Sequence, residues 1–385
     1  MAKVLMKGNE ALAEGAIRAG CRHFFGYPIT PQSELAAYMA KRMPKIGGTY
    51  LQAESEVSAI NMVYGASAAG VRVMTSSSSP GVSLKGEGIS YLIGADLPCL
   101  IVNVERSGPG LGGIQPSQGD YWMSTRATGH GDGHVLVLAP NSVQEMADFA
   151  AKAFELGDRF RMPAMILADG LLGQMMEPVE LPEELDLADL PEKPWALTGT
   201  KLEREHHIAN SLAMEPQDLE DMVLSRRERY RLIKATEQKC EQIMVDDAEV
   251  VVVAFGAASR IALSAVNAAR EQGIKAGLIR PITLWPYPVD AVKAAAQHAK
   301  AFLSVEFSTG QMVEDVRLAV NGKCPVNFFG HTGGIVPDPS EALEAIKLSL
   351  ERADSGEDFE ILPFESKLGL DGSFGKPQAY AERTA

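Results

Sequence analysis

Three short stretches of the chain carry side chains that could bind an anion and move a proton. Thr30 lies in the turn Gly26-Tyr27-Pro28-Ile29-Thr30-Pro31, Glu56 precedes a run of small and apolar residues, and Arg106 follows an apolar run. A guanidinium binds a carboxylate through two parallel N–H groups, and a hydroxyl adds a further donor. A carboxylate in a poorly solvated place can share a proton near neutral pH. Together the three stretches look like half of an active site.

Strand ends would hold these residues. A short apolar run precedes the first turn, whose two prolines keep the chain extended, so Thr30 lies on a stiff loop. Residues 99–104 are predicted to form a buried strand, and Arg106 lies just past its carboxyl end, where open α/β sheets bind ligands. Glu56 opens a predicted buried helix over residues 57–69, which would leave its carboxylate poorly solvated.

Each of these residues also has an ordinary structural interpretation when it is taken alone. Arg106 fits a surface ion pair, Glu56 fits a residue that compensates a helix dipole, and Thr30 fits a turn hydroxyl. Glu54 is the weaker candidate for a proton-sharing group, because residues two apart on a helix face different sides. The conjunction of the three residues is what favours a site.

The chain resembles the α subunit of 2-oxoacid:ferredoxin oxidoreductases, which use thiamine diphosphate (TPP). The resemblance rests on the Tyr-Pro-Ile-Thr-Pro turn, on Ser-Glu-x-x-Ala-x-x-x-x-x-Gly-Ala from Ser55 to Ala66, and on the strand that leads to Arg106. It covers roughly residues 4–350, in order and without a large gap. The first motif is highly specific, the second moderately so, and the third is weak by itself.

The resemblance implies a role for each residue of the predicted site. Glu56 would bond N1′ of the cofactor aminopyrimidine and favour the imino tautomer, whose nitrogen removes the proton from thiazolium C2. Thr30 and Arg106 would bind the carboxylate of the 2-oxo acid. The remaining contacts to the cofactor would come from the turn residues Tyr27, Pro28 and Ile29.

Two patterns place the metal and the electron acceptor on other chains. Gly131-Asp132-Gly133 invites assignment as the motif that holds the diphosphate through Mg2+, but it follows a predicted helix and lacks the expected downstream Asn, so we interpret it as a loop. The four cysteines, Cys21, Cys99, Cys240 and Cys324, include no Cys-x-x-Cys pair that could begin an iron–sulfur site. Few, scattered cysteines are typical of a reducing cytosol.

The implied enzyme converts a 2-oxo acid and coenzyme A (CoA) to acyl-CoA and carbon dioxide, with reduction of ferredoxin. TPP would be shared with a β-type subunit that carries the diphosphate site, Mg2+ and an iron–sulfur cluster. A γ-type subunit is also implied, and a ferredoxin-like δ subunit is compatible with the family. The loop at residues 112–120 looks more like the branched-chain type, with 3-methyl-2-oxobutanoate as an example, and a 2-oxoglutarate enzyme is the second choice.

Two alternatives from other classes stay open. One is a non-catalytic assembly subunit, which the intact Thr30, Glu56 and Arg106 disfavour. The other is a transketolase-like TPP lyase without an electron acceptor, which the missing diphosphate motif disfavours.

Composition agrees with a cytoplasmic enzyme. The chain has 385 residues with 46% hydrophobic and 22% charged residues, which suffices for two cores. A net charge of −14 argues against a nucleic-acid partner, and no apolar run approaches the length of a membrane span.

Alternating apolar runs and helical patterns predict an α/β protein with two doubly wound domains. We expect a pyrimidine-binding domain at 1–176, a linker and long helix at 177–247, a domain like the C-terminal domain of transketolase at 248–352, and an extension at 353–385. The long helix is predicted over 216–245, with Cys240 inside it and residues 226–229 on a solvated or subunit-facing surface.

Three stretches have no firm assignment. Residues 75–81 fit a polar loop as well as a wall of the substrate pocket. The turn at 256–259 could bind an anion at a helix start, although it lacks a full glycine fingerprint. The tail from residue 357 onward lacks periodicity and fits a segment that drapes over a partner.

Overall fold

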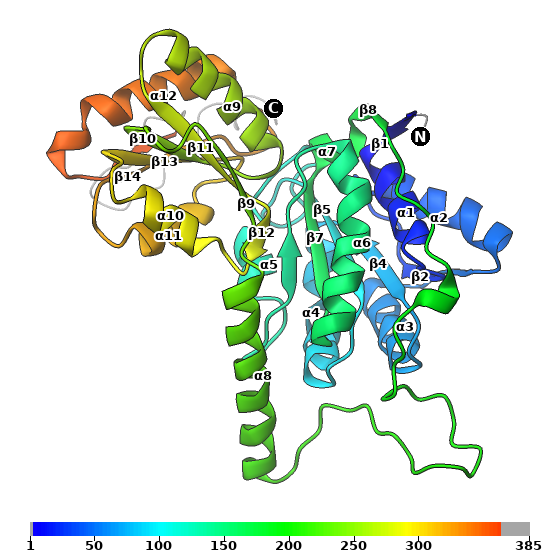
Figure 1. The fold of residues 1–385 in the computed structure, drawn as a ribbon. Coiled ribbons are helices and arrows are strands. Elements are labelled where there is room, and N and C mark those ends of the chain that lie inside the picture. Colours follow the sequence, from blue (N-terminus) through cyan, green and yellow to red (C-terminus); the bar gives the residue numbers. More distant parts are fainter. Residues whose placement is uncertain (1–2, 363–385) are drawn as a thin grey trace, which may run out of the picture.

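Two sheets covered by helices make up the body of the molecule. The computed structural model describes residues 3–362, and Figure 1 shows the two sheets beside each other, with α8 (Pro216–Thr236) extending from their junction. The seven-stranded sheet has the order β12-β6-β7-β5-β4-β2-β3, and the six-stranded sheet has the order β15-β14-β13-β10-β11-β9. The prediction of an α/β protein with two sheets is confirmed.

The first sheet is parallel except at one edge, where β12 runs antiparallel to β6. Its strands are β2 (His23–Gly26), β3 (Thr49–Gln52), β4 (Val73–Ser77), β5 (Leu100–Glu105), β6 (Leu136–Leu138), β7 (Ala164–Asp169) and β12 (Thr283–Trp285). Its helices are α1 (Gly8–Arg18), α2 (Ser33–Arg42), η1 (Met43–Ile46), α3 (Glu56–Ala68), α4 (Ser79–Gly94), α5 (Tyr121–Thr125), α6 (Val143–Phe160) and α7 (Gly170–Gln174). Every residue of β4, β5 and β7 is buried, as in central strands that are covered on both faces.

The second sheet is parallel except for its edge strand β9, which runs antiparallel to β11. Its strands are β9 (Cys240–Ile243), β10 (Val250–Val253), β11 (Ala276–Pro281), β13 (Ala301–Glu306), β14 (Val326–Gly330) and β15 (Glu360–Ile361). The helices of this part are α9 (Gly256–Glu271), α10 (Val289–Ala295), α11 (Met312–Val320), α12 (Pro339–Glu351) and η3 (Ala353–Ser355). A two-stranded sheet of β1 (Val4–Lys7) and β8 (Met176–Val179) lies apart from both.

The domain limits remain a prediction, and one strand crosses them. β12 belongs to the segment predicted as the second domain, yet Thr283 pairs with Leu138 of β6 in the first sheet. Ala139 N–H donates to Ile282 O in the same place. The second half of the chain therefore completes one edge of the first sheet.

The predicted long helix is too long. α8 ends at Thr236, and Cys240 lies in strand β9, not in a helix. Tertiary pairing explains the difference, because Glu241 lies opposite Arg280 in β11 and accepts a bond from Arg280 Nε at 2.9 Å. A charged run whose local sequence favours a helix thus forms an edge strand, because it pairs with β11.

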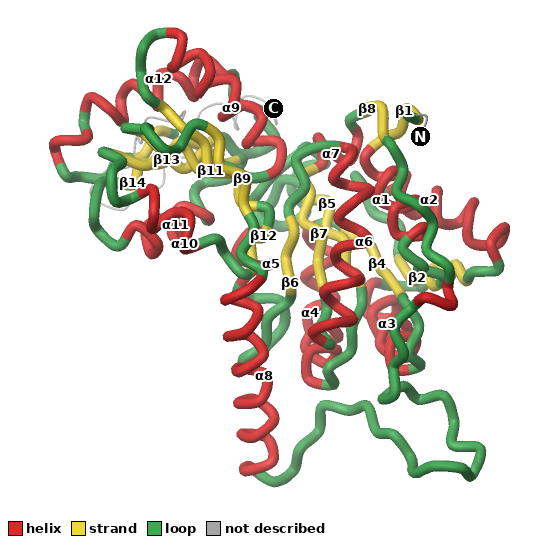
Figure 2. Tube along the Cα trace, in the orientation of Figure 1, coloured by secondary structure: helices red, strands yellow, loops and turns green. Residues whose placement is uncertain are grey.

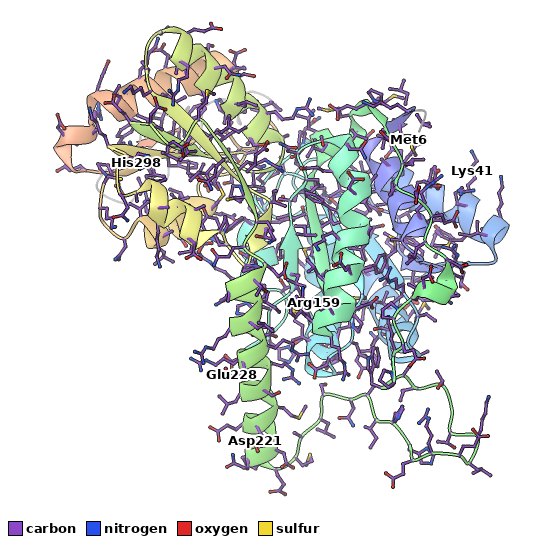
Figure 3. All side chains as sticks on the ribbon, viewed as in Figure 1. Met6, Lys41, Arg159, Asp221, Glu228 and His298 are labelled. Atoms are coloured by element: carbon purple, nitrogen blue, oxygen red, sulfur yellow. The ribbon has the colours of Figure 1, made fainter. Side chains whose placement is uncertain are left out.

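The prediction of a solvated surface at residues 226–229 is wrong for two of the four residues. Arg226 is only 8% exposed, and both Arg226 Nε and Arg229 Nη2 donate to Asp96 Oδ1 after α4. Glu228 is exposed and projects from α8 together with Asp221 (Figure 3). One face of α8 is therefore fastened to the first domain by ion pairs.

The segment between β8 and α8 is almost free of regular structure. Figure 2 shows it as a long loop, interrupted by the short η2 (Leu187–Asp189). The loop touches the first domain through a bond from Tyr64 Oη to Ala209 O at 2.9 Å and another from Leu197 N to Ala68 O. The predicted C-terminal extension lies outside the described residues after 362. Across residues 3–362, no helix combines the length and apolar character that a membrane crossing needs.

Packing of α1 against α6 gives a first prediction. A β-carbon at Gly15 of α1 would lie 2.2 Å from Ala147 O of α6, whereas one at Gly65 of α3 would meet no atom within 4 Å. We expect Gly15→Ala to lower the free energy of unfolding of the full chain by about 1–3 kcal/mol through overpacking. The matched Gly65→Ala should raise it by about 0.5–1 kcal/mol because alanine favours helix. Chemical denaturation measures both, and equal effects would contradict the close approach.

Candidate active site

The loop after β5 brings Arg106 and Thr30 together. Arg106 Nη1 donates to Thr30 O at 3.2 Å, and Arg106 Nη2 donates to Leu111 O at 3.2 Å. Ser79 Oγ, at the start of α4, accepts from Arg106 N at 3.0 Å and lies 3.1 Å from Arg106 O, to which it can donate. Two backbone carbonyls thus hold the guanidinium, Ser79 holds the backbone of Arg106, and further N–H groups of the guanidinium are left for a ligand.

Arg106 lines a cleft of about 500 Å3 between the two sheets. The first domain contributes Ser79, Asp120 and the loop after Arg106, and the second contributes hydroxyl and amide side chains. Those side chains are Ser308, Thr309, Gln311 and Thr332. The cleft therefore has hydrogen-bond donors on both walls.

Thr30 is placed next to this cleft and not in it. Thr30 is exposed and lines a neighbouring cleft of about 560 Å3 with apolar residues that include Ile114, Leu171 and Val336. Among the other turn residues, Tyr27 and Pro28 are exposed and Ile29 is half-buried. The backbone of the turn, not its hydroxyl, makes the contact to Arg106.

Glu56 is the first residue of α3 and is only 6% exposed. Ser55 caps the helix, because its Oγ accepts from Ser58 N at 3.2 Å. No side-chain hydrogen bond from another described residue engages the Glu56 carboxylate. Glu54 by contrast is exposed and accepts from Ser58 Oγ at 2.6 Å. A buried carboxylate without a protein donor suits an N–H group on a ligand.

The polar stretch at residues 75–81 is not a loop, because it forms the end of β4 and the start of α4, and its last part lines the cleft. Thr75 to Ser77 continue β4, Ser78 caps α4, and these side chains are fully buried. Ser76 Oγ donates to Gln32 Oε1 at 2.6 Å, and Ser78 Oγ donates to Val104 O at 2.7 Å. Within this stretch, Ser79 and Pro80 line the cleft with Arg106.

The helix start at residues 256–259 is occupied by a side chain of the first domain. Asp169, at the end of β7, accepts from Ala257 N at 2.9 Å through Oδ2 and from Leu172 N at 3.0 Å through Oδ1. One carboxylate therefore caps both α7 and α9. The anion at this helix start is therefore the carboxylate of Asp169, a side chain of the same protein.

Two buried acids at strand ends, Glu105 and Asp169, and the half-buried Asp120 before α5 escaped the sequence prediction. Burial, then the neighbouring Asp120 and Asp169, raise the pKa of Glu105 well above its usual range. Glu105 Oε2 accepts from Asp120 N at 2.8 Å, while Oε1 has no partner within residues 3–362. Burial also raises the pKa of Asp120 and Asp169. The sequence signal that could have found Glu105 is that an acidic residue directly follows the apolar run at residues 100–104.

Comparisons with known proteins agree with this geometry. Residues 14–245 match the model of the thiamine diphosphate-binding domain of pyruvate flavodoxin/ferredoxin oxidoreductase, and residues 248–342 match core domain II of pyruvate:ferredoxin oxidoreductase. The chain belongs to the 2-oxoacid:ferredoxin oxidoreductase family. The predicted family, fold class and TPP dependence are confirmed.

Individual relatives place the chain within this family. It is 48% identical to ketoisovalerate oxidoreductase subunit VorB of Methanothermobacter thermautotrophicus, over 90% of this chain and 98% of the relative. It is 34% identical to 2-oxoglutarate synthase subunit KorA of the same organism, over 89% of this chain and 97% of that subunit.

Solved structures show the same fold. The 2-oxoglutarate:ferredoxin oxidoreductase of Magnetococcus marinus, solved with 2-oxoglutarate, coenzyme A and succinyl-CoA, has a TM-score of 0.80 at 26% identity, over 91% of this chain and 65% of that one. A split-gene transketolase shares the fold alone, with a TM-score of 0.54 at 13% identity over 90% of this chain and 98% of that one.

Burial of Glu105 gives a prediction on pH. Because its pKa is raised in the folded chain, the folded state holds the Glu105 proton more tightly than the unfolded state. The stabilisation is present below the usual pKa of 4.5 and is lost as pH rises through the folded pKa. We expect the free energy of unfolding to fall with pH above 4.5 less steeply in Glu105→Gln than in the unmodified chain.

Denaturation of the full chain at a series of pH values measures this slope. Glu155→Gln is the matched control, since the Glu155 side chain is 61% exposed and pairs with Lys152. Equal slopes in the unmodified chain and Glu105→Gln would show that Glu105 is ionised in the folded state.

Proposed function

We propose that this chain is the α-type subunit of a CoA-acylating 2-oxoacid:ferredoxin oxidoreductase. The complex converts one 2-oxo acid and one CoA to acyl-CoA and carbon dioxide, and passes two electrons one at a time to ferredoxin. The observation that carries the proposal is Glu56, a buried carboxylate without a protein donor at the start of α3, in a domain of the TPP-binding family.

When bound, TPP supplies the carbon nucleophile that attacks the 2-oxo group and the electron sink for loss of carbon dioxide. Glu56 accepts the hydrogen bond from N1′ of the aminopyrimidine and exchanges its proton there. Tyr27, Pro28 and Ile29 are proposed to contact the cofactor, as in the family. They are accessible in this chain, so a partner subunit and the cofactor can both reach them.

Arg106 and Thr30 are proposed to orient the substrate. The guanidinium lines the cleft between the sheets and keeps unpaired N–H groups beside its two backbone bonds, so it can hold a carboxylate. Thr30 lies next to it with an exposed side chain. These two positions set the substrate carboxylate near the carboxyl end of β5.

A branched-chain 2-oxo acid, such as 3-methyl-2-oxobutanoate, is the favoured substrate. The relatives named for ketoisovalerate are 47% and 48% identical, whereas those named for 2-oxoglutarate are 26–37% identical. Among the described residues that line the cleft, Arg106 is the only cation. A substrate with a second carboxylate would need a further positive partner, so 2-oxoglutarate is the second choice.

Other subunits are proposed to complete the site. A β-type subunit would hold the diphosphate, Mg2+ and an iron–sulfur cluster, and a γ-type subunit and a ferredoxin-like δ subunit would complete the complex. The four free cysteines, well apart in the sequence, support a reducing, cytoplasmic location.

Reduction of a viologen dye by the natively purified complex tests this proposal. We expect CoA-dependent reduction with 3-methyl-2-oxobutanoate, and less with pyruvate or 2-oxoglutarate. Glu56→Gln should lower kcat by about 100-fold or more, since proton sharing is lost. Arg106→Lys should raise KM for the 2-oxo acid about tenfold or more, because a lysine cannot bind a carboxylate through two parallel donors.

Glu54→Gln is the matched control, because Glu54 lies two residues away and is exposed. Full activity of the complex with Glu56→Gln would favour a non-catalytic assembly subunit. Turnover by the isolated chain with TPP and Mg2+, without an electron acceptor, would favour a TPP lyase. No reduction with any of the three acids would contradict the oxidoreductase assignment or its substrate range.

A further inference from the structure

Lys85 is a fully buried lysine inside the first domain. It lies in the middle of α4 and has no exposed surface. Its Nζ donates to Thr75 Oγ1 at 2.8 Å and to Ser76 O at 3.0 Å, both on β4. Neither acceptor is charged, so the hydrogen bonds leave the ammonium group without a direct counter-ion. A buried lysine is costly unless a negative charge lies near it.

The nearest element that carries such a charge is α3. Gly81 lies one helical turn before Lys85 on α4, and a β-carbon there would be 2.6 Å from Glu56 Oε1 and 2.1 Å from Ser77 Oγ. Glycine thus lets the Glu56 carboxylate lie directly on α4. Because residues four apart share a helix face, Lys85 is on the side of α4 that meets this carboxylate. Ser77 Oγ, beside Gly81, is buried and has no partner in the described chain.

Electrostatics agree with this arrangement. Burial lowers the pKa of Lys85 to about 7, and the Glu56 carboxylate acts in the opposite direction. The other titratable group that acts on Lys85 is the thiol of Cys99, just before β5, whose pKa burial raises to about 12. Cys99 is therefore neutral throughout the physiological range, and Glu56 is the charge that Lys85 can balance.

We propose that Lys85 is a positioning residue for Glu56, whose carboxylate its ammonium group keeps ionised at a poorly exposed position. The inference rests on the proposed role of Glu56 as the residue that bonds the aminopyrimidine. Lys85 touches neither substrate nor cofactor and acts only through the carboxylate. A charged Lys85 disfavours the uptake of a proton by Glu56.

Infrared titration of the full chain tests the coupling without catalysis. The C=O band of protonated Glu56 is identified as the band that Glu56→Gln removes, and its intensity is followed with pH. We expect Lys85→Met to move the midpoint upward by about one pH unit or more, since a nearby opposite charge is lost. Lys85→Gln, which removes the charge and keeps an N–H donor, should move it in the same direction and serves if the methionine variant does not fold.

Lys193→Met is the matched control. Lys193, in the loop between β8 and α8, is also a poorly exposed cation, but its Nζ pairs with Asp158 Oδ1 at 2.7 Å. Its loss should change stability and leave the Glu56 midpoint in place. An unchanged midpoint in a folded Lys85 variant would overturn the proposal, whatever its activity.

The pH profile of CoA-dependent dye reduction by the complex gives the functional result. In Lys85→Met the acidic limb of kcat should move to higher pH by the same amount as the infrared midpoint. A purely structural role would lower kcat equally at every pH and would overturn the proposal. Full activity of Glu56→Gln would instead refute the proposed function, while the infrared titration would still decide whether Lys85 and Glu56 are coupled.

Discussion

The arrangement of the site depends on buried polar groups that must find partners where the two sheets meet. Gln118 shows this constraint most clearly. Its Nε2 donates to Phe255 O at 2.8 Å, its Oε1 accepts from Phe307 N at 3.0 Å, and its own N–H donates to Phe307 O. One side chain from the loop after β5 therefore satisfies the ends of two strands of the second sheet. Leaving such groups unpaired would cost about 1–3 kcal/mol each, so the loop cannot shift without a penalty.

Buried polar groups also find partners at the other contacts between the two sheets. Asp169 caps a helix in each half of the molecule, and Gln311 Nε2 donates to Gly119 O at 2.7 Å. Glu306, buried at the end of β13, accepts from the N–H groups of Gln311, Met312 and Val313 and so fastens the start of α11. The cleft with Arg106 lies between surfaces that are held by these bonds, which keeps the guanidinium in place.

The charged groups of the site lie in buried positions, where a charge lowers the stability of the fold. Glu56, Lys85 and Glu105 are all almost completely buried, and none forms an ion pair through a direct hydrogen bond within the described part of the chain. Such groups lower the stability of the fold, so a protein keeps them mainly where function requires them. Clusters of buried charged groups therefore mark functional sites. Other buried charges are paired, as with Arg72 and Asp158 at 2.8 Å, or are held by backbone N–H groups, as with Asp169 and Glu306.

The sequence by itself determined the class of the fold, the family and the motif residues. The apolar runs of β5, β7 and β10 and the turn before Thr30 are local signals, because strand burial and proline geometry act over a few residues. Only the tertiary structure decided that β9 pairs with β11, that β12 joins the first sheet, and that Arg226 is buried against Asp96. It also showed Glu105 and Lys85 as buried charges, since burial and pairing depend on segments far apart in the chain and leave no periodic pattern in the sequence.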